Sequence, residues 1–339
     1  MTGFKVLLTE SISPVGINIL REKVEVVIAP DPSEDTVVSM IRDADALLIR
    51  STKATARMME AGAKLKVIGR HGIGLDNIDL PSANGLGIAV VHTPEANTNA
   101  VAEHALWAMM HCARNFNKAE RDFRQGKFSS GGSLPGLVQK MGYTTKELYG
   151  KVLGLVGMGR IARRLAGIAV NCLNMRVQSY DPMVPEEIFV SVGVKRCGKL
   201  DEVLSGADFV SLHVPYSKET HHLIGERELS LIKPTAYLIN TSRGGVVDEQ
   251  ALYRALKEGR LAGAALDVYE EEPPKMNIPL FELDNVLLTP HMAAMTDLAL
   301  ETMAVDVAVG ILDALQKRRP QYLANPEMWG SAQWTGRQG

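Results

Sequence analysis

Apolar positions along the first hundred residues alternate between two periods. Short β-branched runs, typical of strands, are separated by stretches in which apolar residues recur at helical spacing. Such strands are expected at 4–8, 24–29, 46–49, 65–69 and 88–91, and helices at 14–20, 34–42 and 58–63. Strands that alternate with helices favour parallel βαβ units over a β-sandwich or a helical bundle.

A second alternating series begins near residue 151, after one long helix predicted over 96–124. Its strands are expected at 152–156, 176–180, 209–213, 236–239, 262–268 and 286–289. A last helix is predicted over 296–315, and the tail 331–339 is expected to be loose because it offers little to pack. Two series predict an α/β protein of two domains, in line with 339 residues at ~150 residues per domain.

Composition removes several classes of function. The chain is 46% hydrophobic and 22% charged with a formal charge of −2, so it has no general electrostatic reason to bind nucleic acid or an anionic membrane. The three cysteines have no metal-ligand or disulfide spacing, which predicts no metal site and a reducing compartment. We find no signal peptide and no apolar run of ~20 residues. The expected location is the cytoplasm.

A glycine-rich turn predicts a nucleotide site. The run Gly157-Met-Gly159-Arg-Ile-Ala162 directly follows a predicted strand and opens a helix. The first glycine allows the tight turn, the second lets the backbone approach a pyrophosphate, and Ala162 allows close helix–strand packing. The helix N-terminus then offers free N–H groups to the phosphates.

The next predicted strand ends in a carboxylate, Asp181, 24 residues after Gly157. An acidic residue at about this offset holds the adenosine ribose hydroxyls of NAD, and its charge would repel the extra phosphate of NADP. NAD is therefore the expected cofactor; the alternative is a tight turn and helix cap without a ligand. A second G-x-G, at Gly72 and Gly74, lacks the third small residue and is rejected as a nucleotide site. Its N–H groups could still bind a substrate carboxylate.

Three polar residues, Arg243, Glu272 and His291, follow consecutive strands of the second series. Neighbouring strands lie ~4.8 Å apart and ligands of open α/β sheets bind outside the carboxyl ends of the strands, so the three side chains can converge. A 2-hydroxy acid needs a cation for its carboxylate, which an arginine binds in bidentate fashion. It also needs a base for its hydroxyl proton, and histidine is the side chain that titrates near neutral pH. A carboxylate beside the histidine fixes its tautomer.

Each of the three also has a plain structural interpretation. Arg243 could merely hold the glycine turn that follows it. Only spacing selects Glu272 over Glu270 and Glu271, and a glutamate run before proline is ordinarily a solvated loop. A histidine after a proline is often incidental. The residues alone leave these alternatives open.

Taken together, these motifs resemble the D-2-hydroxyacid dehydrogenase family over most of the chain. The matching segments are Gly157–Ala162 with Asp181, Asn240-Thr-Ser-Arg-Gly-Gly-Val-Val-Asp-Glu249, Leu266-Asp-Val-Tyr-Glu-Glu-Glu-Pro273 and Thr289-Pro-His291. Upstream, Ile49-Arg-Ser-Thr52 and Gly72-Ile-Gly-Leu-Asp-Asn77 resemble the substrate-side loops of phosphoglycerate-dehydrogenase-like members.

The resemblance implies two flavodoxin- or Rossmann-like domains with parallel sheets and a cleft between them. Residues 1–103 and 297–339 would form a discontinuous substrate-binding domain, and 104–296 the NAD-binding Rossmann domain. It implies Arg243 on the substrate carboxylate, His291 as the acid/base and Glu272 as its partner. The implied cofactor contacts are Gly157, Gly159, Arg160, Ile161, Asp181, Val214, Pro215, Thr241 and Asp267. The implied substrate contacts are Arg50, His71, Gly72, Ile73 and Arg243.

The resemblance further implies a homodimer formed through the cofactor domain, and the Gly/Ser-rich stretch 128–146 is expected to lie at that interface or at the cleft edge. The alternative is a loop tolerated because closure entropy grows slowly with length. Departures from the family are Ala162 for a frequent glycine, Ala293 after the histidine, and Phe128 for a common tryptophan. We expect no regulatory domain after residue 320.

The substrate is expected to be a small anionic 2-hydroxy or 2-oxo acid, with D-3-phosphoglycerate among the candidates. A phosphate would need further cations, and Arg50, Lys53 and Arg70 are available. A different class of function, an NAD(H)-sensing corepressor-like binding protein with little turnover, uses the same scaffold and the same Arg/Glu/His set.

Overall fold

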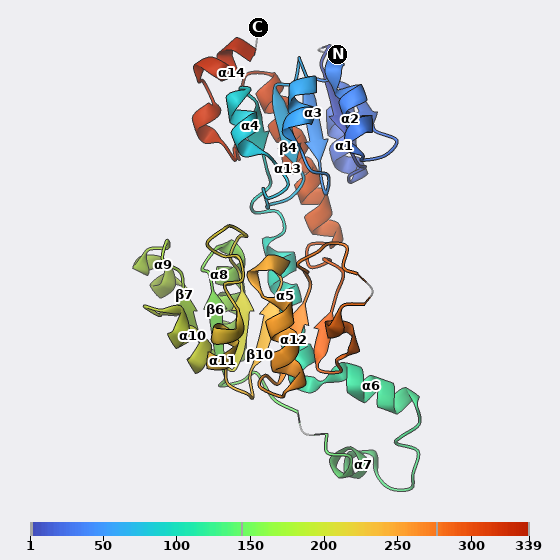
Figure 1. The fold of residues 1–339 in the computed structure, drawn as a ribbon, viewed down its shortest axis with the longest axis vertical. Helices are drawn as coiled ribbons and strands as arrows, with labels where there is room; N and C mark the ends of the chain where they lie inside the picture. Colours follow the sequence, from blue (N-terminus) through green and yellow to red (C-terminus); the bar gives the residue numbers. More distant parts are fainter. Residues whose placement is uncertain (1–2, 144, 276, 338–339) are drawn as a thin grey trace. The chain divides into compact units, whose positions relative to one another are not determined.

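The computed structural model describes residues 3–143, 145–275 and 277–337. It divides into two compact units, which we call unit 1 (residues 3–98 and 294–337) and unit 2 (residues 99–293). Both are α/β units built on an all-parallel sheet (Figure 1). Within the described ranges, none of the helices combines the length and apolarity that crossing a membrane requires.

Unit 1 holds a five-stranded sheet in the order β2-β1-β3-β4-β5. Its strands are β1 Lys5–Leu8, β2 Glu25–Ile28, β3 Ala46–Ile49, β4 Val67–Arg70 and β5 Ala89–Val91. Its helices are α1 Pro14–Arg21, α2 Glu34–Met40, α3 Ala56–Ala61, α4 Leu80–Gly85, α13 Asp297–Leu315 and α14 Ala332–Arg337, with 3-10 turns at Ile41–Asp43 and Pro326–Met328. Helices α1 and α13 pack on one face and α2 to α4 on the other.

Unit 2 holds a seven-stranded sheet in the order β12-β11-β10-β9-β6-β7-β8. The strands are β6 Val152–Val156, β7 Arg176–Tyr180, β8 Lys195–Arg196, β9 Phe209–Leu212, β10 Tyr237–Asn240, β11 Gly263–Leu266 and β12 Val286–Leu288. The helices are α5 Thr98–Arg114, α6 Phe116–Arg124, α7 Leu134–Lys140, α8 Arg160–Leu173, α9 Glu186–Ser191, α10 Leu200–Gly206, α11 Glu226–Leu231 and α12 Glu249–Lys257, with 3-10 turns at Gly244–Val246 and Pro279–Glu282.

Helices cover both faces of the larger sheet. Core side chains of α10, α11 and α12 pack with one face, and those of α5, α8 and α9 with the other. This sandwich explains why the central strands read as continuous apolar runs: every residue of β9 and of β11 is buried. The α/β fold with two parallel sheets is as predicted.

Three predictions about local structure were wrong. The long helix over 96–124 is two helices, because Asn115 adopts a left-handed conformation (φ 49°) between α5 and α6. Helix α7 lies within the Gly/Ser-rich stretch 128–146, for which no helix was predicted, and Ser133 caps its N-terminus. Residues 331–337 of the tail are also ordered: Trp334 is buried, and the Arg337 guanidinium donates to the carbonyls of Leu65, Leu86 and Gly62.

The stretch between α6 and β6 is anchored by one buried carboxylate. Asp122 accepts a hydrogen bond from Lys127 Nζ at 2.7 Å and another from the Tyr143 hydroxyl. Figure 1 shows α6 and α7 extending away from the sheet of unit 2. Leu137 is buried there, but Leu134 and Val138 are exposed. An interface role for 128–146 stays a prediction.

Candidate functional site

The loops at the carboxyl ends of the strands in unit 2 carry most of the predicted site residues. The chain reverses its winding direction between β6 and β9, which are neighbours in the sheet, and such switch points are where open α/β sheets bind ligands. The predicted cofactor residues Gly157, Gly159, Arg160, Ile161, Asp181, Val214, Pro215, Thr241 and Asp267 follow β6, β7, β9, β10 and β11.

The glycine turn after β6 has the geometry of a phosphate-binding loop. Gly157 has φ +94°, and a Cβ at this position would lie 2.6 Å from the His213 carbonyl oxygen, so only glycine fits. Gly159 is the N-cap of α8 and has no side chain with which to cap it. A Cβ built on Gly159 meets nothing within 4 Å in the described chain. There is therefore space beside the N-cap of α8, the end of a helix whose N–H groups and positive dipole end attract phosphates.

Asp181 is fixed against this turn. Its Oδ2 accepts the Met158 N–H at 2.8 Å, and its Oδ1 accepts the Met183 N–H at 2.9 Å. The carboxylate thus lies beside the glycine turn at the end of β7, where the predicted ribose contact requires it. Its contact with the ribose stays a prediction.

Thr241 gives a direct sign of a missing polar partner. Its Oγ1 is buried and has no hydrogen-bond partner among the residues that the structure describes. An orphaned buried hydroxyl costs about 1–3 kcal/mol, so a bound polar group would relieve it. Together with the open N-terminus of α8, this residue set fits a dinucleotide.

His291 and Glu272 form a hydrogen-bonded pair. His291 Nδ1 lies 2.7 Å from Glu272 Oε2, and the other carboxylate oxygen, Oε1, accepts the Tyr269 N–H at 3.1 Å. Burial raises the pKa of Glu272, but the hydrogen bonds from His291 and Tyr269 and the nearby charge of Arg243 outweigh it, so the pKa lies below its ordinary value. Glu272 is therefore ionised at neutral pH and fixes the imidazole.

Arg243 is held by an asparagine turn. Asn240 is 1% exposed; its Oδ1 accepts the Ser242 N–H at 3.0 Å, and its Nδ2 donates to the Arg243 carbonyl at 2.9 Å. Gly244 packs so closely on the backbone of Tyr269 that a side chain could not fit. The Arg243 loop and the Glu272 loop are thus in direct contact, and the structure brings all three predicted catalytic residues to one edge of the sheet.

Asp267 has a role that sequence reasoning missed. Its buried carboxylate accepts the Thr289 hydroxyl at 2.6 Å and the N–H groups of Met292 and Ala293 at 2.9 and 2.8 Å. These bonds hold the turn in which His291 has φ +52°. The sequence signal for this role was that Asp267 directly follows a buried strand and has no cationic residue in the motif 266–273.

Tyr269 was also missed. Burial raises the pKa of Tyr269 to about 12, so its hydroxyl remains protonated and donates to the Thr289 carbonyl at 3.0 Å. Its N–H holds Glu272, and its hydroxyl holds the segment that leads to His291. A buried tyrosine that needs a partner for its hydroxyl was the only sequence signal.

The remaining predicted residues lie in unit 1. Arg50 follows β3, where its Nη2 lies 2.9 Å from Met295 Sδ, and His71, Gly72 and Ile73 follow β4. Burial lowers the pKa of His71 to about 4, so its imidazole is neutral at pH 7. The Arg70 guanidinium donates to the carbonyls of His71 and, at 2.9 Å, of Gly74.

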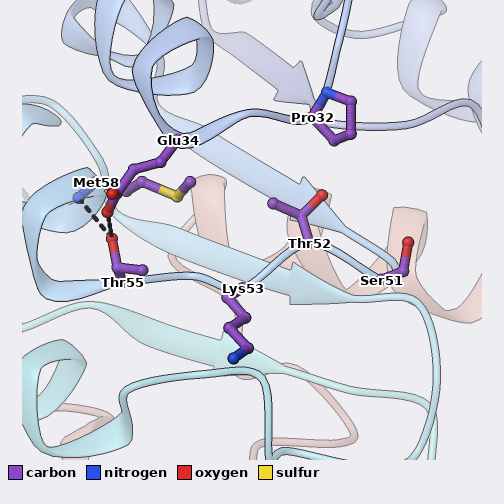
Figure 2. A pocket seen from close by; sticks show the side chains of 7 residues that line it. All are labelled: Pro32, Glu34, Ser51, Thr52, Lys53, Thr55 and Met58. Carbon is purple, nitrogen blue, oxygen red and sulfur yellow. Dashed lines mark hydrogen bonds between the residues drawn. The ribbon is translucent and has the colours of Figure 1, made fainter. Parts of the chain in front are cut away.

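A cavity of about 390 Å³ lies beside the loop after β3 in unit 1. It is lined by Pro32, Glu34, Ser51, Thr52, Lys53, Thr55 and Met58. Figure 2 shows the Glu34 carboxylate at the Thr55 hydroxyl. Ser51, Thr52 and Lys53 belong to or follow the loop that resembles a substrate-side loop of the family, whereas the other four lining residues carry no sequence motif. The described residues contain no cluster of metal-ligating side chains.

Comparison with known proteins agrees with this geometry. The family model "D-isomer specific 2-hydroxyacid dehydrogenase, NAD binding domain" matches residues 106–293. The chain is 40% identical over 322 residues to D-3-phosphoglycerate dehydrogenase of Methanocaldococcus jannaschii, covering 95% of this chain but 59% of that protein. It is 40% identical over 336 residues to glyoxylate reductase of Thermofilum pendens, covering 96% and 95%.

Solved structures give the same answer. D-lactate dehydrogenase of Aquifex aeolicus, crystallised with NAD and lactic acid, superimposes with a TM-score of 0.80 at 30% identity over 92% of this chain and 95% of that one. The chain therefore belongs to the D-isomer-specific 2-hydroxyacid dehydrogenase family, an NAD-dependent enzyme family, and residues 106–293 are its NAD-binding domain.

Proposed function

We propose that the protein transfers a hydride between NAD(H) and C2 of a small anionic 2-hydroxy or 2-oxo acid. The observation that carries the proposal is the 2.7 Å pair of His291 with Glu272, on loops in contact with the turn of Arg243. Interconversion of a hydroxyl and a carbonyl requires a group that carries the proton. His291 can carry it, and the Glu272 carboxylate orients the imidazole.

The residues divide the chemistry between them. NAD, when bound, supplies the hydride acceptor or donor. Because Nδ1 of His291 is engaged by Glu272, Nε2 is the nitrogen that takes the hydroxyl proton on oxidation and returns it on reduction. The charge of Glu272 stabilises the protonated imidazole between these steps. Arg243 binds the substrate carboxylate, preferably in bidentate geometry.

The cofactor contacts are proposed from the loops described above. The open first turn of α8, with Arg160 and Ile161, would receive the pyrophosphate. Asp181 would hold the ribose hydroxyls, and Thr241 would gain the partner that its buried hydroxyl lacks among the described residues. Val214, Pro215 and Asp267 complete the proposed set. Arg50 and the backbone of His71, Gly72 and Ile73 are the proposed substrate contacts of unit 1.

The substrate class follows from the charges and from the relatives. Arg50 and Lys53 are cations in the loop after β3, whereas Arg70 is already hydrogen-bonded to loop carbonyls. Glyoxylate and 3-phosphohydroxypyruvate are the first compounds to test, because a glyoxylate reductase and a phosphoglycerate dehydrogenase are both 40% identical to this chain. The relative named phosphoglycerate dehydrogenase is much longer than this chain.

A panel of 2-oxo acids with NADH, followed by nicotinamide absorbance, tests the proposal. We expect turnover with at least one small anionic 2-oxo acid. Tight NADH binding without turnover on any member would instead indicate the NAD(H)-sensing binding protein and would refute the dehydrogenase. The arginine gives a second arm: Arg243→Ala should raise KM about 10–100-fold, with Arg243→Lys in between because lysine binds carboxylates as a point charge.

We also propose a homodimer formed through unit 2 and a cytoplasmic location. Trp107, Phe116 and Phe123 are exposed on α5 and α6, and a face with several exposed aromatic side chains is typical of a contact surface. The three cysteines are free thiols, which suits a reducing compartment. Sedimentation of the purified protein tests the dimer.

A further inference from the structure

Behind the proposed active site, two glutamates are hydrogen-bonded reciprocally. The Glu249 N–H donates to Glu270 Oε1 at 2.9 Å, and the Glu270 N–H donates to Glu249 Oε1 at 2.7 Å. His222 adds a third contact, with Nε2 lying 3.1 Å from the same oxygen of Glu270. We call these three residues the brace.

The brace joins segments that carry different functional residues. Glu249 is the first residue of α12, and Glu270 lies next to Tyr269, whose N–H holds Glu272. The His222 N–H donates to the Gly245 carbonyl at 2.8 Å, two residues beyond Arg243. The turn 269–272 is thus fixed by two N–H groups, one bonded to Glu272 itself and the other to the brace.

The brace also has an electrostatic cost, which indicates that it does more than fill space. Burial raises the pKa of Glu249, and the nearby charges of Glu270 and Glu272 raise it further. Like charges this close oppose one another, and the opposition is offset only by the N–H groups and by His222. Neighbouring Glu271, in contrast, points to solvent and pairs with Lys275 at 2.9 Å.

We propose that Glu249 and Glu270, with His222, are positioning residues that set the alignment of Glu272 with His291. The inference rests on the proposed function, because alignment matters only if His291 carries the proton. The Glu249 carboxylate acts through the Glu270 N–H. Without that acceptor the turn 269–272 loses its hydrogen bond to α12, and the Glu272 carboxylate is less firmly held toward Nδ1.

Paired variants separate positioning from charge. Glu249→Ala removes both the acceptor and the charge, whereas Glu249→Gln keeps an oxygen acceptor and removes only the charge. Glu271→Ala, in the same loop, is the matched control. We expect kcat to fall about tenfold in Glu249→Ala, with KM and the Kd of NADH within about twofold of wild type. Glu249→Gln and Glu271→Ala should keep nearly full activity.

A second measurement does not depend on turnover. Histidine labelled with ¹⁵N reports the titration of His291, identified by the resonance missing in His291→Asn. Loss of an aligned carboxylate lowers the midpoint of a histidine titration, so Glu249→Ala should shift it down by about half a unit or more, and the other two variants should not. If the panel of 2-oxo acids shows no turnover, the proposed function fails while this measurement still decides the alignment.

Unchanged kcat and titration in Glu249→Ala would overturn the proposal, even if the melting temperature drops. An equal effect of Glu249→Gln and Glu249→Ala would overturn it as well, because charge alone would then explain the change. If Glu249→Ala does not fold, His222→Asn replaces it, since asparagine tolerates the left-handed backbone of His222. We expect a fall in kcat of about two- to threefold there, and no change in kcat or titration would count against the brace.

Discussion

The carboxyl edges of the two sheets treat exposed backbone N–H groups in opposite ways. In unit 1, the Glu10 carboxylate accepts the N–H groups of Arg50, Ser51 and Thr52 at 3.3, 2.8 and 3.3 Å. In unit 2, Gly159 is the N-cap of α8, and no described residue lies within 4 Å of a Cβ built on it. In unit 1 the loop N–H groups are thus bound by a carboxylate of the protein itself, whereas in unit 2 there is space beside the N-cap of α8.

This contrast shows that sheet architecture alone does not assign a nucleotide site. The order β2-β1-β3-β4-β5 of unit 1 is the flavodoxin-like order, which also has a switch point. At these edges the two units differ in that a glutamate after β1 binds loop N–H groups in unit 1, whereas a glycine is the N-cap of α8 in unit 2.

The largest effect should come from the proton carrier in unit 2. His291→Ala should lower kcat by roughly 10²–10⁴, as expected for loss of general acid–base catalysis. The Kd of NADH should change little, because the open turn of α8 is untouched. Steady-state kinetics and fluorescence titration measure the two quantities. Near-wild-type turnover would remove the catalytic assignment of this edge.

Asp181, the carboxylate proposed to bind the ribose, should have the next largest effect, on the choice of cofactor. We expect kcat/KM to favour NAD over NADP at least tenfold, about 1.4 kcal/mol, because Asp181 lies beside the glycine turn. Asp181→Ala should narrow this ratio, chiefly by improving the KM for NADP. Equal efficiency of wild-type protein with both cofactors would contradict the assignment.

A side chain in the space at Gly159 should weaken cofactor binding without unfolding the protein. Gly159→Ala adds a methyl group where there is space and where the backbone has φ −68°, so the melting temperature should hold. We expect the Kd of NADH to rise several-fold, because the pyrophosphate can no longer approach the N–H groups closely. Gly167→Ala, also in α8 with open space at its Cβ, is the control and should leave the Kd unchanged.

Removal of the Glu10 carboxylate should instead lower the free energy of unfolding. Glu10→Ala leaves three N–H groups of the loop after β3 without their acceptor and should cost about 1–3 kcal/mol of unfolding free energy. Urea titration measures this loss. The Kd of NADH should be the same as in wild type, and a weaker Kd would mean that the two edges are not independent.

The same carboxylate gives unit 1 an acid sensitivity. Burial raises the pKa of Glu10, but hydrogen bonds from Ser51 and Thr52 outweigh it, so the folded-state pKa lies below 4.5. A lowered pKa adds stability that is present above the unfolded value and is lost as the pH falls through the folded value. Wild type should therefore lose stability more steeply than Glu10→Gln below about pH 4.5. Parallel acid-unfolding curves would disprove this linkage.

Sequence reasoning succeeded where a feature is local. The strands 46–49, 152–156 and 176–180 coincide with the observed ones. The first two are continuous apolar runs, which are typical of buried parallel strands. The glycine turn and the convergence of Arg243, Glu272 and His291 followed from their positions at strand ends. In each case a period or a fixed spacing carried the information.

It failed where neither a period nor a fixed spacing marks the feature. Asn115 breaks the predicted long helix, although asparagine is only a weak helix breaker. The tail is ordered because Arg337 finds three carbonyls of other segments, a pairing that no local pattern encodes. Glu10, Asp267 and Tyr269 act on loops 20 to 40 residues away, so their functions depend on the tertiary fold.

The packing of α13 on β4 constrains how the chain can be made. A Cβ at Gly69 would lie 2.5 Å from the Ile311 side chain, so the helix sits directly on a strand encoded more than two hundred residues earlier. While the ribosome is still translating unit 2, that face of the N-terminal sheet is covered by α1 but not yet by α13. We expect unit 2 to complete its fold first and the nascent N-terminal segment to need chaperone protection until α13 emerges.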